Sequence, residues 1–521
     1  MVLLMPEIPQ AACATIKSSY AQILRSTAVI GSSTAATIVI NIVKVKAIAV
    51  LLGPGGFGLL GLYTVIVELA ANVAGLGVGN SGVRQIADAV ASGDGDRIAR
   101  TAFVLRRLAL ICGLSGAAAT AVLAVPLSVL TFGNDGHAGA IGILSLAVFF
   151  RVVTAGQAAL VQGMRRVADL AALGVLGALF GAVTAVGIVY AVGEPGVSAS
   201  IAAAAALGFG AAWWYVGKIE IARPAMTPRQ LRREAAELVK LGAAFMASSL
   251  LTIGASYAVR AMVLHVEGLD GAGYYSAAWT LGGLYVGIVL QAMGADFYPR
   301  LVGAISTHAE CNRLVNEQTR ISLLLAGPGV IATLTFATPV MSLFYSTSFV
   351  AAVDVLRWIC LGVALRVITW PIGFIIVAKN NCLVFVAAEL AWTVVNVGLT
   401  WICVRRLGLE GTGIAFFGSY VFHGLMIYTI VRRLTGFGWS AANVRTGALF
   451  LLSIGIVFAA LHVLPTVPAL AFGSAATFVS SAISLRVLVT IVPLERGARR
   501  FPICPQGAAA IRLARRLLSW R

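Results

Sequence analysis

Long apolar stretches separated by short polar segments run through almost the whole sequence. Each apolar stretch is about 20 residues or more, which is the length that a helix needs to cross a bilayer. A transmembrane barrel would show shorter segments of alternating polarity, and stretches such as 199–217 do not alternate. The pattern therefore predicts an all-α polytopic membrane protein with about 14 transmembrane helices. The predicted spans are 26–52, 57–79, 108–131, 138–160, 168–192, 196–217, 241–265, 271–294, 321–343, 355–377, 383–403, 410–431, 446–464 and 468–493.

The composition supports this prediction and excludes a soluble enzyme. Apolar residues make up 59% of the chain, charged residues make up 11%, and the mean hydropathy is +0.93. A soluble domain carries about 25% charged residues, which it needs to cover its water-facing surface. The 7 cysteines are scattered and form no C-x-x-C pair, so we interpret them as small buried residues.

The net charge of +18 is distributed as in a membrane protein rather than as in a nucleic-acid-binding protein. With the N-terminus inside, 29 Lys and Arg residues lie in the inner loops and termini, 2 lie in the opposite loops, and 7 lie within spans. Positive residues are retained on the cytoplasmic side of a membrane. The pattern predicts a multi-pass membrane protein with both termini in the cytoplasm, and no nucleic-acid partner.

A weak internal repeat relates two groups of six spans. At an offset of 215 residues, the spans and loops of the second group coincide with those of the first. Because six is even, both groups keep one orientation, and a pseudo-two-fold axis along the membrane normal relates them. Two such bundles leave a cleft at their interface, which is the architecture of a transporter. The glycines that carry the match are Gly53, Gly56 and Gly58, paired with Gly268, Gly271 and Gly273.

The spans and the repeat together predict six regions of the chain. A helix is expected to begin at Thr227-Pro228, because proline suits the first helical position. The regions are a cytoplasmic N-terminal segment at 1–22, a first six-helix bundle at 23–217, a cytoplasmic amphipathic linker at 218–240, a second six-helix bundle at 241–432, two additional transmembrane helices at 446–493, and a basic amphipathic cytoplasmic tail at 494–521.

Catalytic and metal-binding motifs are missing from the sequence. A G-x-G-x-x-G match at Gly77, Gly79 and Gly82 ends a predicted span, so we interpret these glycines as helix-packing residues rather than a dinucleotide fingerprint. No P-loop, G-x-S-x-G or H-E-x-x-H motif occurs, and the 5 histidines are dispersed. The sequence therefore predicts no enzyme activity, no cofactor and no metal site.

Several cations lie inside predicted spans, where an ionisable side chain is costly and indicates function. Arg151 and Arg366 correspond in the repeat, and Arg260 corresponds to position 45, which lies between two lysines. We interpret these cations as the wall of a cavity that binds an anionic group such as a phosphate. In the alternative interpretation, each cation snorkels to the interface or pairs with an acceptor. The predicted substrate-binding cations are Lys44, Lys46, Arg151, Arg260 and Arg366.

Fewer acids and amides lie inside the spans. Glu68 and Asn72 share a helical face four residues apart, Glu389 is mid-span, and Asp296 is near the inner end of the eighth span. Two interpretations stay open for these residues. They bind a coupling ion or a proton, or they make structural hydrogen bonds in the wall of a polar cavity.

Three segments carry a resemblance to a known family. They are LLGPGGFGLL at 51–60, AGLGVGNSGVRQIA at 74–87, and the second-half counterpart LDGAGYYSAAW at 269–279 with FYPR at 297–300. The chain resembles the O-antigen translocases, the Wzx-type flippases of the multidrug/oligosaccharidyl-lipid/polysaccharide exporter superfamily. The resemblance covers residues 22–432 and is strongest near the start.

The resemblance implies a function. It implies that the chain moves an undecaprenyl-diphosphate-linked oligosaccharide, such as an O-antigen or exopolysaccharide repeat unit, from the cytoplasmic to the periplasmic leaflet by alternating access. The implied partners are this lipid-linked glycan, the bilayer, and the polysaccharide polymerase and chain-length machinery. Two rival interpretations from the same superfamily are a lipid II-type flippase and a cation-coupled multidrug exporter. A membrane-embedded glycosyltransferase is a third, but the chain lacks a long extramembrane segment for catalysis.

Overall fold

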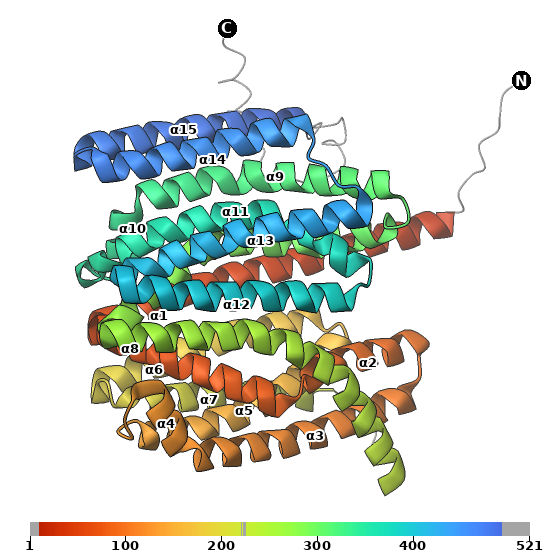
Figure 1. Cartoon of the computed structure of the whole chain (residues 1–521). Coiled ribbons are helices and arrows are strands. Elements are labelled where there is room, and N and C mark those ends of the chain that lie inside the picture. Colours follow the sequence, from red (N-terminus) through yellow and green to blue (C-terminus); the bar gives the residue numbers. More distant parts are fainter. Residues whose placement is uncertain (1–9, 220, 222–223, 225, 492–521) are drawn as a thin grey trace, which may run out of the picture. The chain divides into compact units, whose positions relative to one another are not determined.

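A computed structural model describes residues 10–491 apart from 220, 222–223 and 225. These described residues form helices and connecting turns, with no strand among them, so the predicted all-α fold is confirmed (Figure 1). The elements are α1 Gln10–Gly75, α2 Val78–Ser92, α3 Gly95–Val122, α4 Ala124–Phe132, α5 Ala138–Gly163, α6 Val167–Val192, α7 Gly196–Gly217, α8 Pro228–Gly303, α9 His308–Thr335, α10 Ala337–Phe344, η1 Thr347–Ala352, α11 Val353–Ala378, α12 Cys382–Leu407, η2 Gly408–Glu410, α13 Gly411–Thr435, α14 Ala441–Val463 and α15 Thr466–Ile491.

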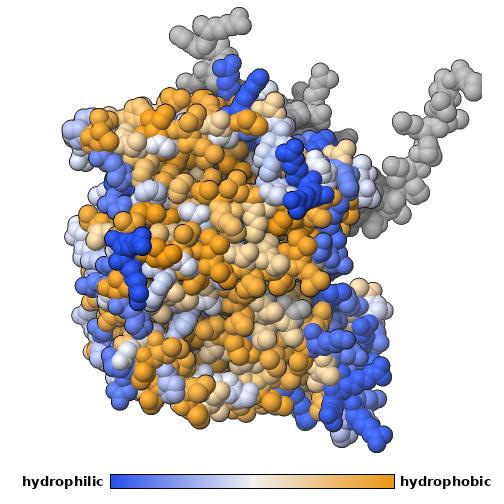
Figure 2. All heavy atoms as spheres, in the orientation of Figure 1, coloured by the Kyte–Doolittle hydropathy of each residue, from blue (hydrophilic) through white to orange (hydrophobic). Residues whose placement is uncertain are grey.

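Most of these helices are long and apolar enough to cross a membrane. Within the described residues there are 10 such ranges, or up to 11 if the bent pair α9 and α10 is one span. The difference from the predicted fourteen arises because three ranges are 45, 42 and 53 residues long. A helix of that length is far longer than the hydrocarbon core is thick, and each of the three contains two predicted spans. Figure 2 shows largely apolar side chains along the helices and hydrophilic ones gathered near helix ends.

The breaks inside the two longest helices explain why they turn back. Gly53 in α1 has φ 65° and ψ −167°, and Gly268 in α8 has φ 73° and ψ −170°. A residue with a Cβ rarely adopts a positive φ, so glycine is the residue that suits both positions. Figure 1 shows α1 turning back on itself near its middle. The two breaks are separated by the 215 residues of the predicted repeat.

The same offset relates other features of the two halves. Helices α5 and α11 each contain 26 residues and begin 215 residues apart, and so do α6 and α12. Gly193 after α6 has φ 75° and ψ −148°, and Gly408 after α12 has φ 67° and ψ −149°. One difference between the halves lies after the second span of each. The first half breaks at Leu76 and Gly77, which both have a positive φ, whereas α8 continues through the equivalent positions to Gly303.

The turns of α1 and α8 contact each other reciprocally. A Cβ placed on Gly58 would lie 2.3 Å from the carbonyl oxygen of Leu269, and one on Gly273 would lie 1.9 Å from that of Pro54. Gly58 and Gly273 are equivalent in the repeat, and so are Pro54 and Leu269, so the two contacts are equivalent. A local two-fold axis between the turns produces such a pair of contacts. Both glycines therefore lie where two backbones approach too closely for any side chain.

The described chain divides into two compact units. The first comprises Met1–Leu284, Phe336–Leu365 and Asn380–Thr429, and the second comprises the rest of the chain from Tyr285 onward. Inside the first unit, α3 and α7 pack against α5, and α6 packs against α1 and α7. Inside the second unit, α14 and α15 pack against α9. By this division, α10, α12 and parts of α11 and α13 belong to the first unit. The two six-helix bundles stay a prediction.

The predicted linker proves to be continuous with the span that follows it. Helix α8 begins at Pro228, as predicted, and a capping box closes its first turn. The backbone N–H of Thr227 donates to Oε1 of Gln230 over 2.9 Å, and the N–H of Gln230 donates to Oγ1 of Thr227 over 3.3 Å. At the other end of the chain, α1 begins at Gln10, so the predicted boundary at residue 22 falls inside a helix. The predicted tail at 494–521 lies outside the described residues.

Candidate functional site

A polar cavity lies in the first unit, at the junction of α1 and α2. Its volume is about 330 Å³, and five helices contribute to its wall. Helix α1 contributes Glu68 and Asn72, α5 contributes Arg151, α3 contributes Ala109, and α8 contributes Ile253. Of the predicted site residues, the structure therefore brings together Glu68, Asn72 and Arg151.

The charged part of the cavity is an incomplete ion pair. A guanidinium nitrogen of Arg151 lies 3.5 Å from a carboxylate oxygen of Glu68. Their side chains remain 43% and 41% exposed, so neither is enclosed by the other. A pair this open leaves most of the guanidinium donors available to a further acceptor, because Arg carries five N–H groups in a planar fork. The cavity can therefore accept an anion at Arg151, or a cation at Glu68.

The first turn of α2 forms the wall beside this pair. Gly77, Val78, Gly79 and Asn80 all line the cavity. Gly77 precedes the helix in the left-handed conformation, at φ 64° and ψ 12°, and no side chain caps the helix. The first N–H groups of a helix have no partner inside it and carry the positive end of its dipole, so this wall favours an anion.

An amide completes the polar lining. The Oδ1 atom of Asn72 is buried and accepts no hydrogen bond from the described residues. A buried acceptor without a donor is costly, so a ligand hydroxyl or N–H that reached this atom would be stabilised there. Together, the helix end, Arg151 and Asn72 offer an anion site next to a hydroxyl site, which suits a phosphate attached to a sugar.

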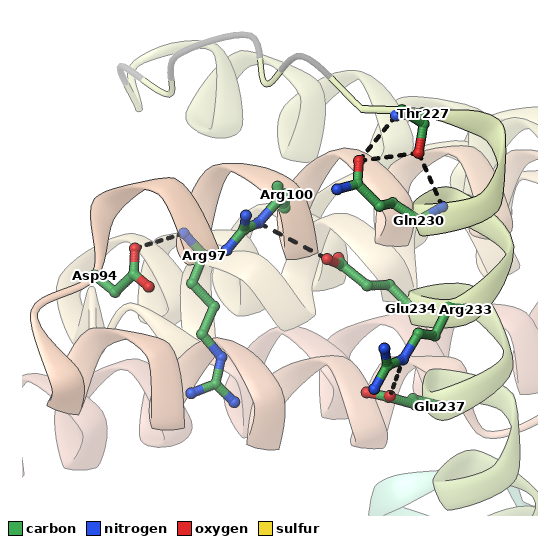
Figure 3. Close-up of polar contacts among 8 residues, drawn as sticks. All are labelled: Asp94, Arg97, Arg100, Thr227, Gln230, Arg233, Glu234 and Glu237. Atoms are coloured by element: carbon green, nitrogen blue, oxygen red, sulfur yellow. Dashed lines mark hydrogen bonds and ion pairs between the residues drawn. The ribbon is translucent and has the colours of Figure 1, made fainter.

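Contacts between α8 and its neighbours lie at the α2 end of the cavity. A Cβ on Gly77 would lie 2.0 Å from the carbonyl oxygen of Gly242, so the two backbones touch. Nearby, Arg100 of α3 lies 3.8 Å from Glu234 of α8, and Figure 3 shows this pair beside the capping box of α8. Burial raises the pKa of the Glu234 carboxyl above its usual value, and the Arg100 guanidinium opposes that shift. These contacts attach the start of α8 to the helices that form the cavity.

The sequence predicted the charged residues of this cavity but not the helix end. Gly77, Gly79 and Asn80 follow the last turn of a span, where the sequence predicts glycines that let helices pack closely. That interpretation is confirmed for Gly82, whose added Cβ would lie 2.8 Å from Leu105. The sequence does contain a signal for the helix end. Glycines follow an apolar helix there, and glycine allows the left-handed conformation that Gly77 adopts before α2.

Comparisons with known proteins agree on the fold. The sequence model of the polysaccharide biosynthesis protein family matches residues 47–354, which is more than half of the chain and includes every residue that lines the cavity. The chain belongs to this family. No curated protein matches the sequence.

Three solved structures with similar folds are two transporters and a lipid flippase. A multidrug resistance MATE family transporter of the MOP superfamily, in an inward-facing conformation, has a TM-score of 0.64 and 19% identity over 77% of this chain and 94% of that one. The lipid II flippase MurJ, in an inward closed conformation, has a TM-score of 0.65 and 14% identity over 88% and 99%. A MOP superfamily transporter from Pyrococcus furiosus has a TM-score of 0.56 and 16% identity over 80% and 95%. At these identities the similarity shows that the chain shares the fold of these proteins.

The other predicted cations do not line this cavity. Arg260 donates to the carbonyl oxygen of Ser256 over 3.2 Å and also to its hydroxyl, and its guanidinium lies 5.8 Å from the Tyr275 ring. Lys44 is half-buried on α1. Arg366 belongs to the second unit. Arg260 donates its hydrogen bonds to a residue of its own helix and not to a ligand site. Its role in binding stays a prediction.

The remaining acidic residues also lie elsewhere. Glu389 is half-buried on α12 and interacts with neighbouring groups. Asp296 falls on α8, and its side chain lies outside the described residues. Within the residues that the structure describes, no group of three or more His, Cys, Asp or Glu side chains is arranged to hold a metal ion.

Lys46 lies in an apolar groove of about 710 Å³ formed by α1, α6 and α10. Its ammonium group donates to the carbonyl oxygen of Ser342 over 2.8 Å. Ser342 belongs to the last turn of α10, where carbonyls have no partner inside the helix, so Lys46 caps α10.

Replacing Lys46 by methionine should therefore affect stability rather than binding. We expect Lys46→Met to lose roughly 0.5–1.5 kcal/mol of stability, because one carbonyl loses its donor. Binding of undecaprenyl diphosphate in nanodiscs should stay within about twofold of wild type, since the ammonium group lies outside the cavity. The apparent melting temperature and the dissociation constant measure the two effects, with the neighbouring Val43→Met as control. A binding loss as large as that of a cavity arginine would place Lys46 in the anion site.

Proposed function

We propose that this chain is a flippase for a polyprenyl-diphosphate-linked oligosaccharide, an O-antigen or exopolysaccharide repeat unit in a bacterial inner membrane. The lipid would move from the cytoplasmic to the periplasmic leaflet by alternating access, with both termini in the cytoplasm and no covalent bond broken. Family membership supports the polysaccharide substrate. The observation that carries the proposal is the cavity that Arg151 and the uncapped start of α2 both line.

The chemistry of the cavity suits the link between the lipid and the sugar. A diphosphate carries charge that a guanidinium and a helix start both stabilise. Sugar hydroxyls donate hydrogen bonds, and the buried Oδ1 of Asn72 is an acceptor that needs a donor. The apolar tail needs no polar cavity, because it stays in hydrocarbon. Each part of the proposed substrate thus has a matching surface.

Reconstitution tests this proposal directly. The purified protein is placed in proteoliposomes with a fluorescent undecaprenyl-diphosphate-linked oligosaccharide, and an externally added lectin reports the fraction of glycan on the outer leaflet. We expect this fraction to approach its two-leaflet equilibrium faster than in protein-free vesicles. Equal rates with and without the protein would contradict the proposal. Faster movement of a quaternary ammonium dye instead would favour the multidrug exporter.

The charge of Glu68 separates an anionic from a cationic substrate. Glu68→Gln removes a carboxylate and leaves Arg151 without its partner, so an anion should bind more tightly, by about threefold to tenfold. A cationic drug or a coupling cation would bind more weakly in the same variant. The measurement is the dissociation constant of undecaprenyl diphosphate in nanodiscs, with Glu389→Gln as the matched control. Weaker binding of the diphosphate in Glu68→Gln would contradict an anion site at this cavity.

A further inference from the structure

A second, apolar groove lies in the first unit on the other side of the α1 segment that lines the polar cavity. Its volume is about 530 Å³. Apolar side chains of α1, α3 and α4 form most of its wall, and α8 contributes Tyr257. Three of them, Val73, Leu123 and Leu130, are 47%, 49% and 64% exposed. In a bilayer, such a surface is open to hydrocarbon.

The groove and the polar cavity share three helices, α1, α3 and α8. On α1, Gly75 lines the cavity and Leu76, the next residue, lines the groove. On α8, Ile253 lines the cavity and Tyr257, one turn later, lines the groove. The place where a phosphate would bind and the place where hydrocarbon would bind are therefore adjacent along α1 and α8.

The hydroxyl groups in the wall of the groove are hydrogen-bonded within the protein. The hydroxyl of Ser115 donates to the carbonyl of Cys112 over 3.1 Å, and that of Thr120 donates to Gly116 over 2.8 Å. The Tyr257 hydroxyl is 2.7 Å from Oγ1 of Thr131 on α4 and bonds to it. Because most of its wall is apolar and its hydroxyls already bond within the protein, the groove suits a hydrocarbon chain better than a headgroup.

We propose that this groove holds the first isoprene units of the polyprenyl chain whose diphosphate lies in the polar cavity. The inference rests on the proposed function. A diphosphate is bonded directly to its prenyl chain, so a phosphate site needs an apolar path that begins beside it. The groove beside Gly75 and Leu76 supplies that path on the α1–α3 side of the first unit. In the groove, the prenyl chain is kept out of the polar cavity, where its apolar surface would be exposed to water.

Two neighbouring alanines of α3 provide a matched test. Ala119 lines the groove, whereas Ala118 is exposed on the same helix and does not line it. Ala119→Trp should fill the groove and weaken the binding of undecaprenyl diphosphate in nanodiscs by about tenfold or more. Ala118→Trp should change it by about twofold or less. Ser115→Trp, one turn before Ala119 in the groove, is a second blocking variant in case Ala119→Trp is poorly folded.

A probe without a tail separates this inference from the proposed function. Inorganic diphosphate should bind Ala119→Trp and wild type within about twofold, because the phosphate site is unchanged. If both groove variants bind undecaprenyl diphosphate as wild type does, the prenyl chain does not lie in this groove. The proposed function would then stand without it. If Ala118→Trp loses as much affinity as Ala119→Trp, the groove is not the site. If wild type does not bind undecaprenyl diphosphate, both proposals are overturned.

Discussion

Replacing Arg151 by alanine should weaken the binding of undecaprenyl diphosphate about 10-fold to 100-fold. A hydrogen bond to a charged group contributes roughly 1.5–3 kcal/mol, and about 1.4 kcal/mol corresponds to a factor of ten in affinity. The loss has a second source, because Glu68 stays in the cavity and then repels the anion without a compensating charge. Transport in proteoliposomes should fall with the affinity.

The lysine variant separates geometry from charge at this position. Arg151→Lys keeps the positive charge but loses the fork that binds a phosphate through two parallel bonds. We expect it to regain only part of the affinity. Arg107→Ala is the matched control, because Arg107 is exposed on α3, lies over the Phe103 ring and does not line the cavity. If Arg151→Ala, present at normal abundance, binds the diphosphate like wild type, Arg151 is not its ligand.

Replacing Gly273 by alanine should destabilise the fold strongly. The added methyl group would lie 1.9 Å from the carbonyl oxygen of Pro54, and the obstacle is backbone rather than a flexible side chain. Overpacking of this kind costs about 1–3 kcal/mol, and more where the backbone must move. Gly58→Ala should behave similarly, because the reciprocal contact places its methyl group 2.3 Å from the carbonyl oxygen of Leu269.

A glycine on the same helix serves as the control for this prediction. Gly283 has nothing within 4 Å of the position where its Cβ would lie. Gly283→Ala should therefore be neutral or stabilise the protein by up to about 1 kcal/mol, since alanine favours a helix more than glycine does. Apparent melting temperatures in detergent measure all three variants. Equal temperatures for Gly273→Ala and Gly283→Ala would mean that the turns of α1 and α8 do not touch.

Local features of the sequence were sufficient to predict most of the membrane-spanning helices, but not α2. The length of each apolar stretch predicted where a helix crosses the bilayer, and Thr227-Pro228 predicted the start of α8. Gly53 and Gly268 predicted the paired turns. A positive φ depends on the residue type at one position, and glycine is the residue that adopts it readily. Hydropathy alone did not show that α8 continues without a break from the polar linker into the membrane.

The candidate site depended on tertiary structure. The sequence predicted five cations in one cavity, and the structure places Arg151 beside Glu68 while Lys46 caps α10 and Arg260 bonds to its own helix. The physical reason is that a helix in lipid is apolar on almost every side, so its hydrophobic pattern does not show which face meets a neighbour. The rotation of each helix about its own axis decides which cation lines the cavity, and packing against other helices decides that rotation. The start of α2 also joins the site only through the fold, because packing brings it to the same cavity as Arg151.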